Sequence, residues 1–558
     1  MTTEYADTHH PDHRTGEGVA GGEHTAYPGG GGQVAAAVDL ARETQRWWAS
    51  IGFAGRRHLL DRWRRELTDG LDELAALVHS ETGKPVGDAV LEIGLAIEHL
   101  AWAARKAPRV LGRRRVGSTL LAAHLAASVE YLPYGVIGVI GPWNYPVFTP
   151  MGSIAYALAG GNTVVFKPSE LTPATGQWLA DSCERAVGSP ALQVVQGGGD
   201  VGEALCRAGV DKLGFTGSTA TARKVMATCA ESLTPVLVEG GGKDALIVDA
   251  DGDVQAAAQA AVWGGMSNAG QTCIGVERVL AHTEVYDELV AAIAREASRL
   301  RAGLDDEADY GPITLPKQVG IIREQIAEAR AAGAVDLVDV TLAGPDTPDD
   351  PVAGQNPPDD PVAGPDTPDD PVVGQAPPDD PVAGQKPPMS RPPRVASSLD
   401  DPERLIQPVV LADTPRGARI LTEETFGPVL TIERVSDMDE AVELANASSY
   451  GLGGAVFSRR RGPELARRIR SGMTSVNNVI GFAGLPELPF GGVGGSGFGR
   501  IHGADGLREF CYAKSVARQR FTPPVSMTNF ERRARVDGIF KTAVTALHGT
   551  RPWGKGPR

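Results

Sequence analysis

Cysteine is scarce in this chain, and no long hydrophobic run is present. Five cysteines are spread over 558 residues, with no CxxC pair and no group of histidines at metal-ligand spacing. An odd and sparse set of cysteines is typical of a reducing compartment, so we expect a cytoplasmic protein without a structural metal. No apolar run approaches the ~20 residues that a membrane-spanning helix needs. The N-terminus also lacks the apolar core of a secretory signal.

A surplus of positive charge is missing as well. The chain has 54 Lys and Arg against 69 Asp and Glu, which gives a formal net charge of −15. An acidic chain does not favour nucleic acid or an anionic membrane as the partner of its main body. Its length is sufficient for two or three domains with sizeable cores.

One acidic segment has no aromatic side chain. Between Gly344 and Pro388 a ten-residue unit recurs, as in GPDTPDDPVA and GQNPPDDPVA. Such a segment cannot bury enough apolar surface to offset its ordering entropy, and its prolines favour an extended backbone. Ten Asp and three Lys or Arg within 341–395 account for −7 of the net charge. We expect 341–395 to be a disordered insertion that a surface loop tolerates; a segment that docks a partner or acts as a spacer is the alternative.

The two terminal segments also lack the pattern of a packed domain. Residues 1–33 are rich in His, Gly and acidic residues and predict a disordered arm. Residues 517–558 contain nine Lys and Arg against two Asp and Glu, with Ile539 and Phe540 among apolar residues at near-helical spacing. A basic amphipathic tail contacts either a membrane or a protein surface, and Gly538 weakens its helix. We favour a surface or subunit-contact helix over membrane contact.

The most informative residue is Cys273, which ends the sequence Gly-Gln-Thr-Cys at 270–273. Glu239 stands upstream in Glu-Gly-Gly-Gly-Lys, where glycines permit close approach of the backbone. A thiol nucleophile and a carboxylate that activates water are the minimum for forming and hydrolysing a thioester. Because a free cysteine is more often buried and inert, the interpretation of Cys273 depends on the other motifs.

Polar residues follow several short strand-like runs. The run 134–140 is rich in β-branched residues and closes with Gly-Pro, which predicts a buried strand with Asn144 in the following loop. There the Asn144 amide is available to stabilise an oxyanion. Residues 162–170 predict a second strand, which ends in Lys, Ser and Glu, and 212–218 predict a third that leads into a helix start. Repeated strand, loop and helix indicate an open parallel α/β sheet over 131–238, and a second α/β stretch follows from 239 and resumes with a strand at 405–411.

Asn144, Lys167, the turn Gly217–Ser218, Glu239 and Cys273 follow one another on successive βα units. Together with the sequences EETFGPV at 423–429 and PFGGVGGSG at 489–497, they make residues 34–516 resemble the NAD(P)-dependent aldehyde dehydrogenase superfamily. The second of these sequences, followed by Ile-His-Gly, is similar to the class 3 branch.

The resemblance implies an α/β fold with two open parallel-sheet, Rossmann-like domains and a β-hairpin oligomerisation arm. It also implies a homodimer or homotetramer. The expected parts are a cofactor-binding domain at 34–114 and 134–238, a catalytic domain at 239–340 and 396–483, and the arm at 115–133 and 484–516.

The resemblance assigns catalysis to three residues. Cys273 attacks the aldehyde, Asn144 and the Cys273 N–H stabilise the oxyanion, and Glu239 activates the water that hydrolyses the thioester. It assigns NAD or NADP to strand ends and glycine turns, where Lys167 and Glu170 hold the adenosine ribose. The full implied cofactor set is Ile140, Trp143, Lys167, Ser169, Glu170, Gly199, Gly202, Phe215, Gly217, Ser218, Gly240, Glu424 and Phe426.

The resemblance also implies a tunnel whose walls carry no cationic residue, so we expect an uncharged aldehyde substrate. The implied tunnel residues are Tyr145, Thr149, Gly152, Ser267, Thr272 and Ile274. Small residues at 152 and 267 imply a roomy tunnel.

Two departures from the family pattern leave alternatives open. Gly240 replaces the usual leucine, and Asp244-Ala245 replaces the usual Ser-Pro. Losing the leucine predicts a looser Glu239. A CoA-acylating enzyme is one alternative, which Glu239 disfavours because a base for water competes with acyl transfer. A non-catalytic scaffold is the other; the intact Cys273, Glu239 and Asn144 disfavour it, whereas Gly240 keeps it open.

Overall fold

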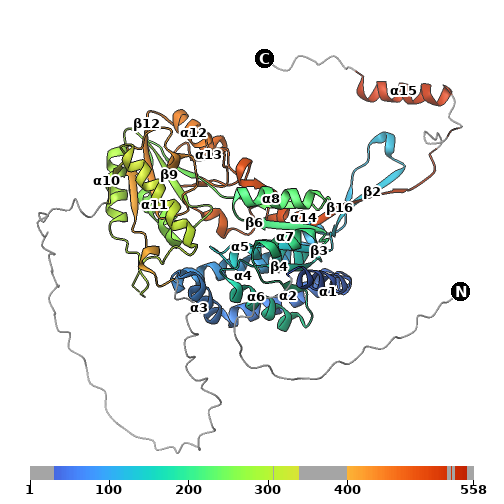
Figure 1. The fold of residues 1–558 in the computed structure, drawn as a ribbon. Coiled ribbons are helices and arrows are strands. Elements are labelled where there is room, and N and C mark those ends of the chain that lie inside the picture. The colour runs from blue at the N-terminus through green and yellow to red at the C-terminus, as the bar shows by residue number, and fades with distance from the viewer. Residues whose placement is uncertain (1–29, 306, 339–398, 524–529, 531–533, 550–558) are drawn as a thin grey trace, which may run out of the picture.

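The computed structural model describes residues 30–305, 307–338, 399–523, 530 and 534–549. Over these residues the chain forms two parallel α/β units and a smaller antiparallel sheet (Figure 1). This arrangement confirms the expected α/β fold class. The predicted insertion at 341–395 and most of the predicted N-terminal arm lie outside the described residues.

The first parallel sheet has the strand order β15-β7-β6-β3-β4-β5. Its strands are β3 (Val136–Ile140), β4 (Thr163–Lys167), β5 (Leu192–Val194), β6 (Lys212–Thr216), β7 (Val236–Glu239) and the antiparallel β15 (Gly497–Phe498). From β3 the chain continues to β4 and β5 on one side, and to β6 and β7 on the other. In open parallel sheets, ligands bind at the carboxyl ends of the strands beside such a switch point.

Helices cover both faces of this sheet, so its strands are continuously apolar. One face carries α1, α7 and α8; the other carries α5 and α6, which α2, α3 and α4 cover in turn. The bounds are α1 (Gly30–Ser50), α2 (Gly52–Asp69), α3 (Leu71–Thr82), α4 (Val86–Leu111), α5 (Phe148–Gly160), α6 (Pro173–Val187), α7 (Gly199–Arg207) and α8 (Thr219–Ala230). Helix α1 begins within the predicted arm 1–33, because Val34, Val38 and Ala41 pack into the core and offset the low helix propensity of the glycines before them.

The second parallel sheet has the order β10-β11-β12-β9-β8-β13-β14. Helices α9, α10 and α11 pack on one face, and α12 and α13 on the other. The strands are β8 (Asp244–Val248), β9 (Val276–His282), β10 (Val335–Asp336), β11 (Val409–Ala412), β12 (Val429–Val435), β13 (Ala455–Phe457) and β14 (Ser475–Val476). The helices are α9 (Val254–Met266), α10 (Tyr286–Ala297), α11 (Pro316–Ala331), α12 (Met438–Asn446) and α13 (Gly462–Arg468). The strand predicted at 405–411 begins only at Val409, because Pro408 has no N–H for the ladder and Leu405 follows a 3-10 turn.

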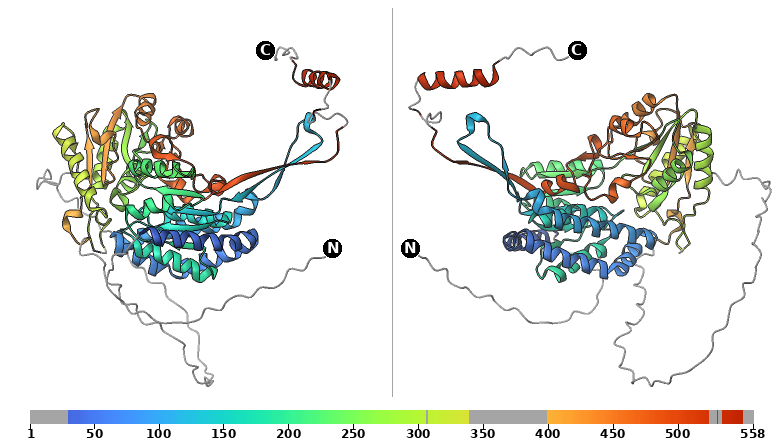
Figure 2. Two further views of the ribbon diagram at one scale, coloured as in Figure 1. Left: turned by 45° about the vertical axis from the view of Figure 1, so that its right-hand side comes forward. Right: turned by 180° about the vertical axis from the view of Figure 1, so that it is seen from behind.

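An antiparallel arm extends away from the two units (Figures 1 and 2). It consists of β1 (Arg114–Val116), β2 (Leu125–Pro133) and β16 (Cys511–Gln519), with β2 in the middle. Strand β16 runs past the predicted boundary at 516, because it pairs with the whole of β2. Helix α14 (Gly503–Glu509), which was expected in the arm, packs instead against α4 and α5.

Helix α15 (Ala534–His548) lies beyond the tip of the arm (Figure 2). It falls in the segment predicted to form a basic amphipathic tail. Among the described residues, no helix combines the length and the apolar character needed to span a bilayer.

We expect deletion of residues 344–388 to change the free energy of unfolding by no more than about 1 kcal/mol, because the entropy of closing a loop varies only with the logarithm of its length. The insertion leaves and re-enters beside β10 and β11, which pair with each other at the edge of the second sheet. Urea unfolding of both chains measures the difference. A loss of several kcal/mol would show that the repeat packs against the two units.

Candidate active site

The thiol of Cys273 and the carboxylate of Glu239 meet where the two parallel sheets adjoin. Glu239 ends β7 of the first sheet, and Cys273 lies in the loop before β9 of the second. The Sγ of Cys273 donates to Glu239 Oε1 over 3.7 Å. Cys273 is also the only one of the five cysteines that is not fully buried. The structure therefore brings the two predicted residues together and leaves the sulfur accessible.

Strained backbone positions the thiol. The 3-10 turn Ser267–Gly270 precedes it, and within this turn Asn268 and Ala269 adopt φ of 53° and 56°. Residues with a Cβ avoid this left-handed region. Gly270 has φ 70°, and a Cβ there would lie 2.0 Å from the carbonyl oxygen of Gly427. Such strain persists only where the surroundings fix the backbone, and it is concentrated at functional sites.

Asn144 is fastened to the same turn. Its Nδ2 donates to the Gln271 carbonyl over 2.8 Å, and its own carbonyl accepts from Asn268 Nδ2 over 3.0 Å. Because a side-chain amide carries two N–H groups, one remains for a substrate oxygen. The Cys273 N–H forms no backbone hydrogen bond within the described part of the chain. Two donors are thus available beside the sulfur.

A buried ion pair holds the Asn144 loop in place. Lys84 Nζ lies 2.7 Å from Glu92 Oε2, and the two side chains are only 1% and 0% exposed. Lys84 also donates to the Asn144 carbonyl over 2.8 Å. Glu92 accepts the N–H groups of Val147 at 2.8 Å and Phe148 at 3.1 Å. Sequence reasoning missed this pair, because the backbone groups that it binds lie 55 to 60 residues further along the chain.

Burial controls the protonation of the reactive groups. It raises the pKa of Glu239 to about 7, against hydrogen bonds from Cys273 and Thr216 that lower it. Burial, and then the charge of Glu239, raise the pKa of the Cys273 thiol well above its usual 9.0. The sulfur therefore rests as a thiol, and Glu239 exchanges protons near neutral pH. A base with a pKa near the working pH is suited to general base catalysis.

The predicted ribose-binding residues and the turn Gly217–Ser218 follow the carboxyl ends of β4 and β6, whereas Gly199 and Gly202 lie in α7 after β5. Lys167 Nζ lies 3.5 Å from Glu170 Oε2 at the end of β4. Burial lowers the pKa of Lys167. Ser169 follows, and its Oγ accepts the Leu171 N–H over 3.2 Å. Ile140 ends β3, and Phe215 stands one residue before the end of β6.

The N-termini of helices α7 and α8 complete the predicted cofactor site. Ser218 caps α8, where its Oγ accepts the Thr221 N–H over 3.3 Å, and Gly217 precedes it. A Cβ on Gly199 would have no neighbour within 4 Å, and one on Gly202 would reach only Ile140 at 3.8 Å. Packing within the chain does not require these two glycines. The open space beside them and the helix N-termini fit a dinucleotide with its phosphates.

The predicted nicotinamide contact Glu424 lies beside the glycine run that follows Glu239. Gly242 N–H donates to Glu424 Oε1 over 2.9 Å, and a Cβ on Gly241 would lie 2.2 Å from Glu424 Oε2. The glycine run thus lets Glu424 lie directly against the backbone. Burial raises the pKa of Glu424 to about 8. The ring of Phe426 meets that of Trp143 edge to face at 5.6 Å.

Gly240 is required by packing. A Cβ there would lie 2.9 Å from the carbonyl oxygen of Gly495 and 3.2 Å from Ser496 Cα. Its N–H donates to the Ser496 carbonyl over 2.9 Å. The expectation that glycine leaves Glu239 loosely held is therefore not supported, since the turn at 494–496 fills that space.

A cavity of about 760 Å³ opens beside Cys273 and Glu239. Five of the six predicted tunnel residues line it; Gly152 does not. A Cβ on Gly152 would lie 2.7 Å from Ile501 Cδ1, so this glycine lets Ile501 approach and does not widen the cavity. The lining residues that sequence reasoning missed come from α4, α5, α9 and 480–501: Asp88, Leu91, Glu92, Leu95, Phe148, Trp263, Ile480, Ala483, Phe490 and Ile501.

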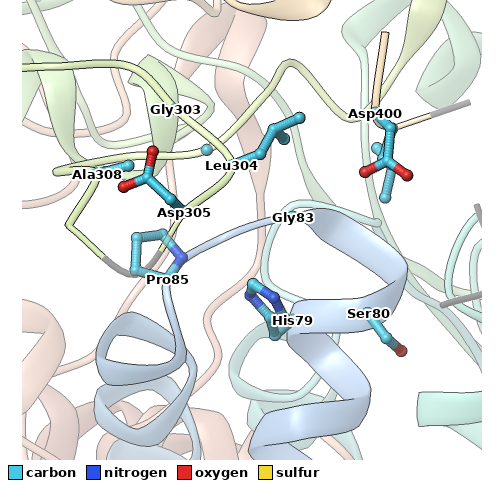
Figure 3. A pocket seen from close by; sticks show the side chains of 11 residues that line it. His79, Ser80, Gly83, Pro85, Gly303, Leu304, Asp305, Ala308 and Asp400 are labelled. Atoms are coloured by element: carbon cyan, nitrogen blue, oxygen red, sulfur yellow. The ribbon is translucent and has the colours of Figure 1, made fainter. Parts of the chain in front are cut away.

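A second hollow of about 440 Å³ lies between the end of α3 and the loop 303–308 (Figure 3). His79, Pro85 and Asp305 face it, and Asp400 stands at its rim. It shares no lining residue with the first cavity and contains none of the predicted site residues. The cavity beside Cys273 is therefore the candidate active site.

Comparison with known proteins agrees with the fold. Residues 24–350 and 393–516 match the aldehyde dehydrogenase family. A 4,4'-diapolycopene aldehyde oxidase from Methylomonas is 32% identical over 514 residues, covering 91% of this chain and 86% of the relative. A benzaldehyde dehydrogenase [NAD(+)] from Pseudomonas putida is 30% identical over 511 residues, covering 90% of each.

Other relatives widen the range of cofactors and substrates. One from Mycolicibacterium smegmatis, 31% identical over 522 residues and covering 92% of this chain and 90% of the relative, is named for succinate semialdehyde and NADP. The structure of an NAD-dependent aldehyde dehydrogenase from Sinorhizobium meliloti is 28% identical with a TM-score of 0.74, covering 89% of each chain. The chain belongs to the aldehyde dehydrogenase family. The expected NAD or NADP cofactor is confirmed at this level, whereas the relatives do not single out the class 3 branch.

We expect the Glu239→Gln substitution to accelerate alkylation of Cys273 by iodoacetamide severalfold at pH 8. The Glu239 charge raises the pKa of the thiol, so removing it lowers that pKa and increases the thiolate fraction. Mass spectrometry of the labelled peptide measures the rate, with Cys273→Ala as the unlabelled control. Slower labelling would instead show that Glu239 assists the thiol as its base.

Proposed function

We propose that this chain oxidises an aldehyde to a carboxylic acid with NAD or NADP, through a thioester on Cys273. The observation that carries this proposal is the 3.7 Å contact between the Cys273 thiol and Glu239 at the wall of a substrate-sized cavity. One group is a nucleophile and the other is a base for water, which are the two roles that thioester formation and hydrolysis require.

The sulfur of Cys273 releases its proton to solvent water and bonds to the aldehyde carbon, which gives a thiohemiacetal. The Asn144 Nδ2 and the Cys273 N–H donate to the resulting oxyanion. A bound nicotinamide cofactor would supply the acceptor for the hydride of this carbon, and loss of that hydride leaves a thioester on Cys273. Glu239 then takes a proton from water, the oxygen adds to the thioester, and the carbon–sulfur bond breaks. One aldehyde and one water give one carboxylate, one hydride equivalent and two protons.

The residues present fit such a cofactor. Lys167 and Glu170 at the end of β4 suit a ribose, and the N-terminus of α8 after Gly217 suits the pyrophosphate. Glu424 and Phe426 suit the nicotinamide riboside.

The substrate is an uncharged aldehyde in this proposal. Within the part of the chain that the structure describes, no Lys, Arg or His lines the cavity, and most of its wall is aliphatic or aromatic. Apolar pockets with a few placed polar groups are the usual form of small-molecule sites. The relatives named for benzaldehyde and 4,4'-diapolycopene aldehyde support this choice.

The arm supports assembly into a homodimer or homotetramer. Strand β16 is at the edge of its sheet, and most of its residues are exposed. An exposed edge strand offers unpaired N–H and C=O groups to a second copy of the chain.

The test is a rapid-mixing experiment with benzaldehyde and NAD or NADP, followed at the absorbance of the reduced cofactor. We expect the Glu239→Gln chain to show a burst of about one reduced cofactor per chain and then turnover that is about 10²–10⁴ times slower, because the base is missing only from hydrolysis. Cys273→Ala should show no burst. A Glu239→Gln chain without a burst would contradict the assigned roles. Faster turnover on adding CoA would indicate acyl transfer to CoA in place of hydrolysis.

The steady-state rate should fall about tenfold from pH 8 to pH 6 where hydrolysis limits turnover. The sign follows from the pKa of Glu239, about 7, because only its ionised form accepts a proton from water. In Glu239→Gln this limb of the pH profile should disappear. A limb that survives the substitution would assign the base to another residue.

A further inference from the structure

Asp88 differs from the other acidic residues that line the catalytic cavity. Its side chain forms no hydrogen bond or ion pair with any residue that the structure describes. Glu92 lines the same wall, but Lys84 neutralises it at 2.7 Å. Glu239, at the reaction centre, has a pKa of about 7 and is partly protonated at neutral pH. Burial raises the pKa of Asp88, and the charge of Lys84 lowers it. Because Lys84 also pairs with Glu92, one cation serves two carboxylates, and among the described residues no Lys, Arg or His lines the cavity itself.

Asp88 lies away from the sulfur, near the mouth of the cavity. It occupies the first turn of α4, and Leu91 and Leu95 follow it on the same helix face and also line the cavity. Leu91 is 52% exposed and Trp263 is 48% exposed, which marks their side as the one open to solvent. A ligand that reaches Cys273 along this wall therefore places its far end beside Asp88.

Tyr145 interacts with groups near both ends of this wall. Its hydroxyl is 2.9 Å from Thr272 Oγ1, and Thr272 directly precedes Cys273. Burial raises the pKa of Tyr145, and the charges of Glu92, Asp88 and Cys273 raise it further. The charge of Asp88 therefore acts on a side chain that contacts the residue before Cys273.

A carboxylate in such a wall that is only partly compensated acts strongly on a charged ligand. Electrostatic interactions between partly buried groups are several times larger than in water, and a cleft of one charge sign concentrates ions of the other. The field would oppose a second carboxylate and attract a cation. It would leave an uncharged aldehyde unaffected.

We propose that Asp88 is a specificity-determining residue that excludes aldehydes bearing a carboxylate and favours those with a cationic group at the far end. This inference rests on the proposed aldehyde oxidation at Cys273. The first turn of a helix also favours a carboxylate through the helix dipole. That structural role would not depend on the charge of the substrate, so the two roles can be separated.

The test compares three four-carbon aldehydes: butanal, succinic semialdehyde and 4-(trimethylammonio)butanal. For each chain, the ratio of kcat/KM to that of butanal removes effects common to all substrates. We expect Asp88→Asn to raise the succinic semialdehyde ratio about tenfold and to lower the trimethylammonium ratio by a similar factor. Asp88→Lys should move both ratios further in the same directions. The matched control is Glu98→Gln, which removes one exposed carboxylate from the same helix outside the cavity and should change neither ratio.

A second readout does not require turnover. The same aldehydes, without cofactor, compete with iodoacetamide for Cys273, and the protection that each gives should follow the same order. Oxidation of butanal with unchanged ratios in both Asp88 variants would overturn the role of Asp88 and leave the dehydrogenase intact. Protection that depends on charge and on Asp88, with no oxidation of any aldehyde, would support charge selection and contradict the proposed reaction.

Discussion

The buried ion pair of Lys84 and Glu92 is the constraint on which the geometry of the active site depends. Both side chains form further hydrogen bonds. Lys84 donates to Glu92 and to the Asn144 carbonyl, and Glu92 also accepts two backbone N–H groups of the next loop. Removing one member of such a pair costs about 3–5 kcal/mol, because the other is left charged and buried. The pair therefore holds the Asn144 loop against the turn that carries the thiol.

The reactive groups beside this loop are largely buried, and burial disfavours their charged forms. Burial raises the pKa of Glu239 and Asp244 to about 7 and that of Glu424 to about 8. The folded chain then binds these protons more tightly than the unfolded chain, so its stability falls as the pH rises from the ordinary carboxyl range towards these values. At neutral pH the folded chain is therefore less stable than it would be if these three carboxyl groups had ordinary pKa values. The same burial yields a base that ionises near neutral pH.

Local sequence patterns were sufficient for the parts of the site that stand at strand ends. The runs before Asn144 and Lys167 were predicted as strands, and the structure has β3 and β4 there. The side of the cavity opposite the strands could not be predicted in this way. Asp88 and Glu92 occur in an ordinary amphipathic helix, and only the packing of α4 against α5 brings that helix face to the cavity. Gly152 shows the same limit: a small residue suggested space, but Ile501 fills it from a distant segment.

The repeat insertion is connected at the edge of the second sheet, whereas the active site depends on strands inside the sheets. The site depends on β7 of one sheet and on the loop before β9 of the other, and β9 lies between β12 and β8 inside its sheet. The insertion instead joins β10, an edge strand, to β11. Two strands, β11 and β12, separate that edge from β9. A long connection can therefore vary at the edge without moving Cys273, because the inner strands are held on both sides by their own hydrogen bonds.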